Sequence, residues 1–382
     1  MDPAASPAAP APKSRSEAGG CRRRVRRTAG WLTAIMVLGA CSAWAWAGHA
    51  WIADLGANLT AQWAGVAALA GTAALIARRR RLACAYALGA ALAGAGLLAP
   101  ARAPRSRDPA SANATLRVMV LNARSASSGA RATADAILAA EPDVAVILET
   151  PAELFGFLRE GSELRALMPF GWVPPSAGPG FTVVLTRWAQ RGGPDWSGDA
   201  SATFADGVRA MIVDRPSGAF CMLVLHPDSP RSAGRWRRGN RLIEHAVGVV
   251  AERLRPTGLP ILIAGDLNAS PPSWRSRRLC AAAGVRRAKP LLVPAGTWPA
   301  PSFWPLRVAI DDVLASPGVA VSSWRTAAIP GSDHSAVVAE LVMPAPSAAR
   351  RPPLAARAER SSARRSLAVT PNARAPAPNT AP

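Results

Sequence analysis

The stretch Leu259-Pro260-Ile261-Leu262-Ile263-Ala264-Gly265-Asp266-Leu267-Asn268 decides the fold. Its first part is aliphatic and partly β-branched between a proline and a glycine, which predicts a buried strand. Asp266 and Asn268 follow at the carboxyl end of that strand. Residues two apart on an extended chain point to the same side, so we expect one carboxylate and one amide to face a common ligand.

Other apolar runs of this kind also end in polar residues. The pattern predicts strands over 115–121, 144–148, 181–186, 210–213, 220–225 and 336–342, with helices over 130–140 and 239–254. One polar residue at a strand end is usually a turn-former. A set of carboxylates, amides and imidazoles at successive strand ends instead indicates a functional site, made of Asn122, Glu149, His226, Asp266, Asn268, Asp311, Asp333 and His334.

The net charge of +21 resembles that of a nucleic-acid-binding protein until it is apportioned along the chain. Residues 111–344 contain 24 Lys or Arg and 19 Asp or Glu, a net charge of only +5. Most of the net positive charge therefore belongs to the terminal segments and to a loop between apolar stretches, which weakens the case for a nucleic-acid-binding surface.

Three apolar stretches, Trp31 to about Ala53, Ala61 to Ala77 and Leu82 to about Pro100, are each roughly long enough to cross a bilayer as a helix. Seven Lys or Arg residues precede the first stretch, and four, Arg78 to Arg81, separate the second from the third. The positive-inside rule predicts a cytoplasmic N-terminus and an exterior location after residue 100. A cleaved signal peptide is the alternative for the first stretch and leaves that location unchanged.

The composition divides the chain into five segments. Residues 1–28 and 344–382 are rich in Ala, Pro, Arg and Ser and lack an apolar period, which predicts disordered tails. We expect a three-helix membrane anchor over 29–100, a linker over 101–114 and one α+β domain over 115–343.

The polar strings resemble, in order and spacing, the endonuclease/exonuclease/phosphatase superfamily, whose fold is deoxyribonuclease-like. The matching strings are Val120-Leu121-Asn122, Pro142-Asp143, Ile147-Leu148-Glu149, Leu225-His226, Gly265-Asp266-Leu267-Asn268, Ile310-Asp311 and Ser332-Asp333-His334. The resemblance covers about 115–343 and implies a four-layer αββα sandwich of two mixed sheets with helices outside. It also implies hydrolysis of a phosphate ester that depends on a divalent metal, Mg²⁺ or Mn²⁺.

The resemblance also implies which residues hold the metal. Glu149 would be the principal ligand, with Asn122 beside it and Asp333 as a further contributor. Oxygen donors of this kind suit a hard cation, and such a cation offsets the negative charge that makes a phosphodiester repel hydroxide.

In the superfamily, residues of the remaining strings transfer protons and bind the phosphate. By this resemblance Asp266 would orient or deprotonate the attacking water, and Asn268 would hold a phosphate oxygen. His334, steadied by Asp311, would be a second general acid/base or a phosphate contact, while His226 would protonate or stabilise the leaving oxygen.

Three local features bear on the partner of His334 and on the substrate. Asp312 follows Asp311, so either carboxylate is a candidate partner of His334. The only tyrosine, Tyr86, lies in the third apolar stretch, whereas abasic-site endonucleases of this superfamily use an active-site tyrosine, which argues against DNA repair. Trp298, Trp304 and the Pro-rich residues between them predict a loop at the rim, for which core packing, membrane contact and substrate stacking all stay open.

The sequence thus predicts a membrane-anchored, exterior-facing, metal-dependent phosphoesterase that uses direct water attack. Its substrate would be a nucleic acid, a phospholipid headgroup or an inositol phosphate, and no obligate protein partner is expected. A catalytically inactive, membrane-tethered interaction module of the same fold is the alternative, and the retention of every motif residue disfavours it. The substrate itself depends on loops that have no readable code.

Overall fold

A computed structural model describes residues 15–100, 115–123, 130–159, 163–172, 181–191, 208–291, 293 and 295–345. The predicted linker over 101–114 lies outside these residues, as does the predicted C-terminal tail apart from residues 344 and 345. The predicted N-terminal tail lies outside them only up to residue 14, because helix α1 begins at Arg15. Residues 15–28 are therefore helical rather than disordered, and six of them are Arg, a good helix former.

The strands of the domain form two six-stranded sheets. The first sheet has the order β11 (Ala320–Ala328), β12 (Ser335–Val342), β1 (Thr115–Asn122), β2 (Val144–Thr150), β4 (Phe181–Thr186) and β3 (Phe170–Trp172). The second has the order β5 (Gln190–Arg191), β6 (Val208–Val213), β7 (Phe220–Leu225), β8 (Ile261–Asp266), β10 (Asp311–Ala315) and β9 (Arg286–Arg287). The predicted mixed α/β fold with two sheets is confirmed.

The two sheets pack face to face over one apolar core. Alternate residues of each central strand enter it, such as Val118 and Val120 of β1 and Leu262 and Ala264 of β8. The residues between them point outward, as the two-residue period of a strand requires. Met119, for example, belongs to a second cluster, on the other face of the first sheet. Each central strand is thus buried on both faces, which explains its nearly continuous apolar sequence.

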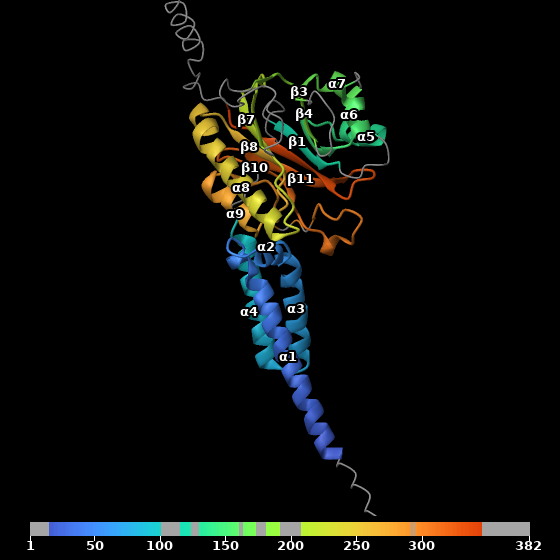
Figure 1. Ribbon diagram of the computed structural model, residues 1–382, viewed down its shortest axis with the longest axis vertical. Coiled ribbons are helices and arrows are strands. Elements are labelled where there is room, and N and C mark those ends of the chain that lie inside the picture. Colours follow the sequence, from blue (N-terminus) through green and yellow to red (C-terminus); the bar gives the residue numbers. More distant parts are fainter. Residues whose placement is uncertain are drawn as a thin grey trace, which may run out of the picture. The chain divides into compact units, whose positions relative to one another are not determined.

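Helices cover the outer face of each sheet (Figure 1). The first sheet is covered by α5 (Ala130–Ala140), α6 (Ala152–Arg159) and α7 (Glu163–Leu167), and the second by α8 (Ala233–Val249), η3 (Val250–Leu254), η4 (Arg255–Thr257) and α9 (Trp274–Ala282). Helix α8 begins six residues before the predicted 239, because the Ser232 side chain caps it by accepting a hydrogen bond from the Arg235 amide.

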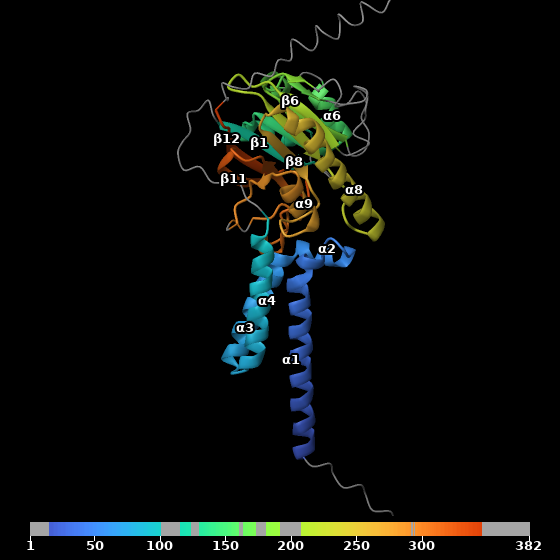
Figure 2. The ribbon, with the colours of Figure 1, turned by 90° about the vertical axis from the view of Figure 1, so that its left-hand side faces the viewer.

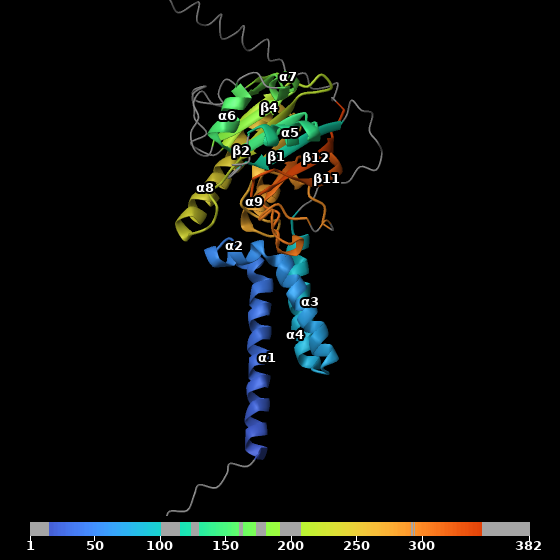
Figure 3. The ribbon, with the colours of Figure 1, turned by 90° about the vertical axis from the view of Figure 1, so that its right-hand side faces the viewer.

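Four helices precede the domain, namely α1 (Arg15–Trp46), α2 (Trp51–Asn58), α3 (Thr60–Ile76) and α4 (Arg80–Leu98). Among the described residues, Arg24–Trp46 and Arg80–Leu98 are each long and apolar enough to cross a membrane. Helices α2 and α3 pass that test only together and are bent by 69°. The first apolar stretch, expected to reach about Ala53, ends at Trp46, and α2 lies across the end of α1 (Figures 2 and 3).

Each sheet contains one parallel pair of neighbouring strands, β1 with β2 and β7 with β8. Parallel strands end at the same edge, so the polar residues that follow them are brought together. In the second pair, Leu225 of β7 is level with Gly265 of β8. Gly265 has a φ of +155°, and a Cβ there would lie 1.9 Å from the Leu225 carbonyl oxygen.

Gly265→Ala is expected to lower the free energy of unfolding by about 3 kcal/mol or more, because the new methyl group would force β7 and β8 apart. Gly248→Ala is the matched control, since no atom lies within 4 Å of a Cβ at that position in α8 and alanine favours helices. Urea denaturation of the detergent-solubilised full chain measures both variants. Equal stability of the two would contradict the close approach of these strands.

Candidate active site

The second sheet contributes two site residues through the parallel pair β7 and β8. His226 directly follows β7, and Asp266 is the last residue of β8. His226 stands two residues after Val224, and Asp266 two residues after Ala264. Val224 and Ala264 point into the core between the sheets, so strand alternation turns both site residues to the same side. The two side chains therefore lie at the edge of that core, with 3.9 Å between His226 Nε2 and Asp266 Oδ2.

The first sheet contributes Asn122 and Glu149 through the parallel pair β1 and β2. Asn122 is level with Leu148, so Glu149 follows directly beside it. Strand alternation alone would turn Glu149 away from the core, because Leu148 already points inward. Glu149 instead adopts a φ of +47° at an irregularity in the pairing of β2 with β4. This backbone conformation is costly for a non-glycine residue, and such strain is often found at functional sites.

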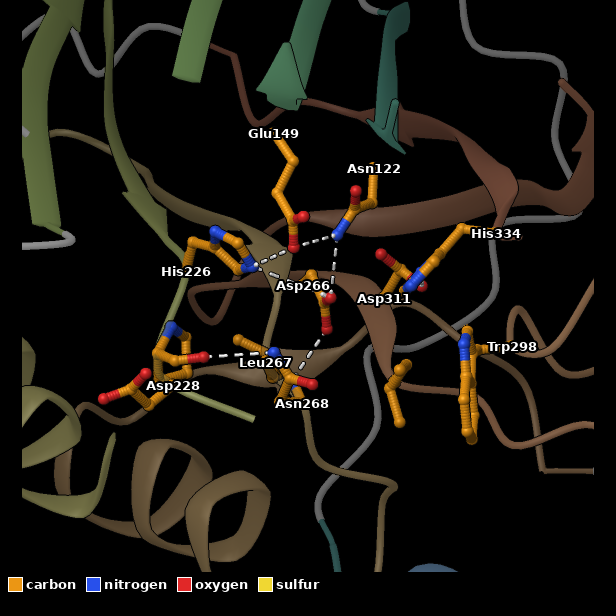
Figure 4. A network of polar contacts seen from close by, with 12 residues as sticks. Asn122, Glu149, His226, Asp228, Asp266, Leu267, Asn268, Trp298, Asp311 and His334 are labelled. Carbon is orange, nitrogen blue, oxygen red and sulfur yellow. Dashed lines mark hydrogen bonds and ion pairs between the residues drawn. The ribbon is translucent and has the colours of Figure 1, made fainter. Parts of the chain in front are cut away.

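The side chains from the two sheets meet at the Asn122 amide (Figure 4). Asn122 Nδ2 donates to Glu149 Oε1 at 3.1 Å and to Asp266 Oδ2 at 3.3 Å. His226 Nε2 lies 3.4 Å from Glu149 Oε1. One amide and one imidazole thus hold together two carboxylates that come from different sheets.

A second imidazole reaches the same edge from the loop before β12. His334 Nδ1 lies 2.9 Å from Asp311 Oδ2, and both side chains are buried. Asp311 is paired with Asp266 in the antiparallel register of β10 and β8. The Ser332 hydroxyl accepts from the His334 amide and donates to the Asn122 carbonyl, which ties this loop to β1.

The neighbouring carboxylate Asp312 has a different set of partners. Asp312 Oδ2 lies 2.6 Å from Arg287 Nε, and Asp312 Oδ1 accepts from Trp324 Nε1 at 2.9 Å. Arg287 also donates to the Ser276 hydroxyl on α9. The structure therefore pairs His334 with Asp311, and Asp312 belongs to a buried ion pair that holds β9, β10 and β11 together.

Two predicted site residues lie at the margin of this group. The Asn268 amide nitrogen of the backbone donates to Asp266 Oδ1 at 2.8 Å, and Asn268 Nδ2 donates to the Pro227 carbonyl at 3.0 Å. Asp333 accepts from Trp298 Nε1 at 3.2 Å and stands 4.0 Å from His334 Nε2. Trp298, expected only as part of a rim loop, thus contacts a predicted site residue directly.

The packing of these groups changes their pKa values. Burial, together with the nearby charge of Asp311, raises the pKa of Asp266 to about 6. Burial alone would lower the pKa of His334, but the charge and hydrogen bond of Asp311 outweigh it and raise the pKa to about 9. Burial alone would also lower the pKa of His226. The hydrogen bond to Glu149 and the charges of Asp266 and Glu149 outweigh burial and raise that pKa.

The donor set fits a hard divalent cation. Glu149, Asp266 and Asp311 bring three carboxylates to one edge, and Asp311 Oδ1 is buried without a hydrogen-bond partner among the residues that the structure describes. Ligand atoms of Asp266, Asp311 and His334 all lie within 4.8 Å of one another. Carboxylate oxygens supplemented by an amide and an imidazole suit Mg²⁺ or Mn²⁺ better than a thiophilic metal.

Comparison with known proteins identifies a family match over most of the domain. Residues 119–334, more than half of the chain, match the endonuclease/exonuclease/phosphatase family. The match begins in β1 and ends at His334, so it includes Asn122 and every later residue of the site. No curated protein sequence matches the chain.

The solved structures that the chain is similar to share little sequence with it. An endonuclease/exonuclease/phosphatase from Beutenbergia cavernae is 22% identical, with a TM-score of 0.46, over 60% of this chain and 72% of that one. Truncated TDP2 from Caenorhabditis elegans is 15% identical, with a TM-score of 0.45, over 60% and 98%. Sphingomyelinase C from Streptomyces griseocarneus is 17% identical, with a TM-score of 0.42, over 59% and 99%.

The two adjacent aspartates are expected to respond differently to substitution. Asp312→Asn should lower the free energy of unfolding by about 3–5 kcal/mol, because it leaves the buried Arg287 cation without its counter-charge. Asp311→Asn should cost less, because it also removes a negative charge that opposes ionisation of Asp266. Urea denaturation measures both, and an equal loss would contradict the separate roles of the two carboxylates.

Proposed function

This chain belongs to the endonuclease/exonuclease/phosphatase family, and we propose that it hydrolyses a phosphate ester with the help of a divalent metal ion. Membership of the family supports a hydrolase of the phosphoesterase or nuclease type. The observation that carries the proposal is the meeting of Glu149, Asn122 and Asp266 from the two sheets, with two imidazoles beside them.

Glu149 is the proposed principal ligand of Mg²⁺ or Mn²⁺, with Asn122 beside it and Asp333 as a further contributor. Bound there, the ion would neutralise charge on the phosphate and make the phosphorus more electrophilic. Glu149 is well placed for this role because its strained backbone turns the carboxylate toward the edge of the core. Asp333 would join from the loop before β12, where it lies near His334.

Asp266 is the proposed base. Its pKa of about 6 lets it ionise at neutral pH while remaining basic enough to accept a proton from water. As the water oxygen bonds to phosphorus, the bond from phosphorus to the ester oxygen breaks. Asn268 Nδ2 has one hydrogen on the Pro227 carbonyl and a second one to donate to a phosphate oxygen.

The two histidines are the proposed proton donors. His226, whose raised pKa favours the protonated form, would give its proton to the leaving oxygen. Asp311 holds His334 through Nδ1, so Nε2 is the atom that would donate to the phosphate. Both groups complete the reaction without a covalent intermediate on the protein.

The N-terminal helices support a second part of the proposal, a membrane anchor with the domain outside the cytoplasm. Helices α1 and α4 have the length and apolar composition of membrane spans, and α2 with α3 would supply a third. The basic residues in the first half of α1, up to Arg27, and at Arg78–Arg81 support a cytoplasmic location for those helix ends.

The full chain in detergent micelles is expected to hydrolyse bis(p-nitrophenyl) phosphate, or one of DNA, RNA, sphingomyelin and inositol phosphates, in Mg²⁺ or Mn²⁺ and to stop on addition of EDTA. Glu149→Gln and His334→Gln should each lower kcat by about 10²–10⁴-fold, because they remove a metal ligand and a proton donor. Calorimetric titration with Mn²⁺ should show weaker binding in Glu149→Gln than in the wild-type chain.

Matched controls are available on one exposed turn of α8. Glu244→Gln and His245→Gln make the same chemical changes away from the site and should leave turnover within about twofold of the wild-type chain. Turnover that survives EDTA, or that falls equally in the control variants, would refute the assignment of the site. An absence of turnover on all substrates, together with no Mn²⁺ binding, would refute the enzyme.

The location is tested separately. Protease added to intact cells that express the chain should remove the domain over 115–343 and leave the helices protected within the membrane. Degradation of the domain only after the cells are permeabilised would reverse the proposed orientation.

A further inference from the structure

The N-terminal helices bind three loops of the domain through hydrogen bonds to loop backbone. Trp51 Nε1 on α2 donates to the Pro230 carbonyl at 2.6 Å. Asn58 Oδ1, at the end of α2, accepts from the Ser270 amide at 2.7 Å. The third loop, which contains η5 (Trp304–Leu306), is held by α3, as described below. The helices are therefore docked onto the domain rather than joined to it only through the chain.

Asp54 of α2 lies at the centre of this contact. Its carboxylate is only 1% exposed and accepts from Trp236 Nε1 at 2.9 Å and from the Trp274 amide at 3.0 Å. A buried carboxylate is costly unless donors surround it. Both donors come from the domain, so the position of α2 is specific to this surface.

The loops that α2 and α3 hold are also the loops of the site. Ser270 follows Asn268 by two residues, which limits the distance between their α carbons to about 7 Å, and Pro230 follows His226 by four, which limits that distance to about 14 Å. The third loop, Trp298–Arg307, is here called the rim loop. Its first residue, Trp298, donates to Asp333. The surface that the helices contact thus includes two loops that follow site residues and one loop whose first residue contacts Asp333.

The rim loop also has an apolar surface. Phe303 is 68% exposed, Leu306 62% and Trp298 36%, and in the described part of the domain the other large apolar side chains this exposed are Phe170 and Leu291. Gln62 Nε2 of α3 donates to the Pro305 and Arg307 carbonyls, both at 3.0 Å. Gln62 is the third residue of a helix that continues into the apolar segment, so the rim loop is held level with the start of that segment.

We propose that the rim loop rests in the surface of the membrane and that the site acts on a phosphate ester carried by a membrane amphiphile. This rests on the proposed function, and it narrows the substrate to a lipid headgroup. Aromatic and aliphatic side chains beside the end of a membrane helix are typical of groups that enter the interface. A nucleic acid duplex, in contrast, would have to approach an edge that the helices and the bilayer already border.

The position of the rim loop is tested without any activity. In full chains that have Cys21→Ser and Cys84→Ser, Phe303→Cys is labelled with a nitrobenzoxadiazole dye and reconstituted in phosphatidylcholine vesicles that contain a minor share of phosphatidylglycerol. The dye should shift to the blue, resist an aqueous quencher and be quenched by lipids that have a nitroxide at the headgroup. The matched control is Phe170→Cys, in the edge strand β3 of the first sheet.

Equal access of the aqueous quencher to both dyes would overturn the proposal. This outcome is independent of catalysis, so it does not depend on whether a substrate has been found. A failure of the proposed function would appear in a different measurement. The unlabelled wild-type chain would then turn over no ester, even though the dye at residue 303 of the labelled variant lies in the membrane surface.

The choice of substrate is tested by comparing an ester in phospholipid vesicles with a water-soluble ester. The double variant Phe303→Ser, Leu306→Ser should lose about tenfold or more of its activity on phospholipid vesicles, because it removes two apolar side chains from the interface. Its turnover of water-soluble bis(p-nitrophenyl) phosphate should stay within about twofold of the wild-type chain, as should that of Phe170→Ser on both substrates. Faster wild-type cleavage of DNA or RNA than of any vesicle-borne lipid, or an equal loss on both esters, would overturn the proposal.

Discussion

The arrangement of this domain depends on three carboxylates that share one edge of the core, of which Asp266 and Asp311 are buried. Glu149, Asp266 and Asp311 come from three strands, and their mutual repulsion in a region of low dielectric would drive them apart. The Asn122 amide and the imidazoles of His226 and His334 oppose that repulsion. Burial and the remaining repulsion from Asp311 together raise the pKa of Asp266, and a divalent cation would offset that repulsion further.

The same constraint explains the local strain around the site. Glu149 reaches the edge only by adopting a positive φ, and the carboxyl end of β8 approaches β7 only because residue 265 has no side chain. Both features cost stability. The buried Arg287–Asp312 pair, a few ångströms along β10, ties neighbouring strands together without contributing to the chemistry. Two adjacent aspartates thus serve different purposes, because consecutive residues of a strand point to opposite sides.

The contact between the helices and the domain favours one orientation of the site relative to the helices. The Asp54 carboxylate is satisfied by donors of the domain, and the loops that follow His226 and Asn268 are held by α2. An anchor attached by a free linker would leave the site facing any direction. Here the contacts favour one direction, with the rim loop beside the helix that leads into the apolar segment.

The sequence by itself determined the two-sheet α/β fold and the family, because apolar period and polar strand ends are local patterns. It also predicted the polar residues that meet at the edge, from Asn122 to His334. It did not predict β11, whose burial pattern is irregular, or the break between α1 and α2, because the apolar sequence continues across it. Only the tertiary structure decided that Asp311 faces His334 and that Asp54 and Gln62 hold the loops of the site. Those choices depend on pairing between residues far apart in the chain, which no local pattern records.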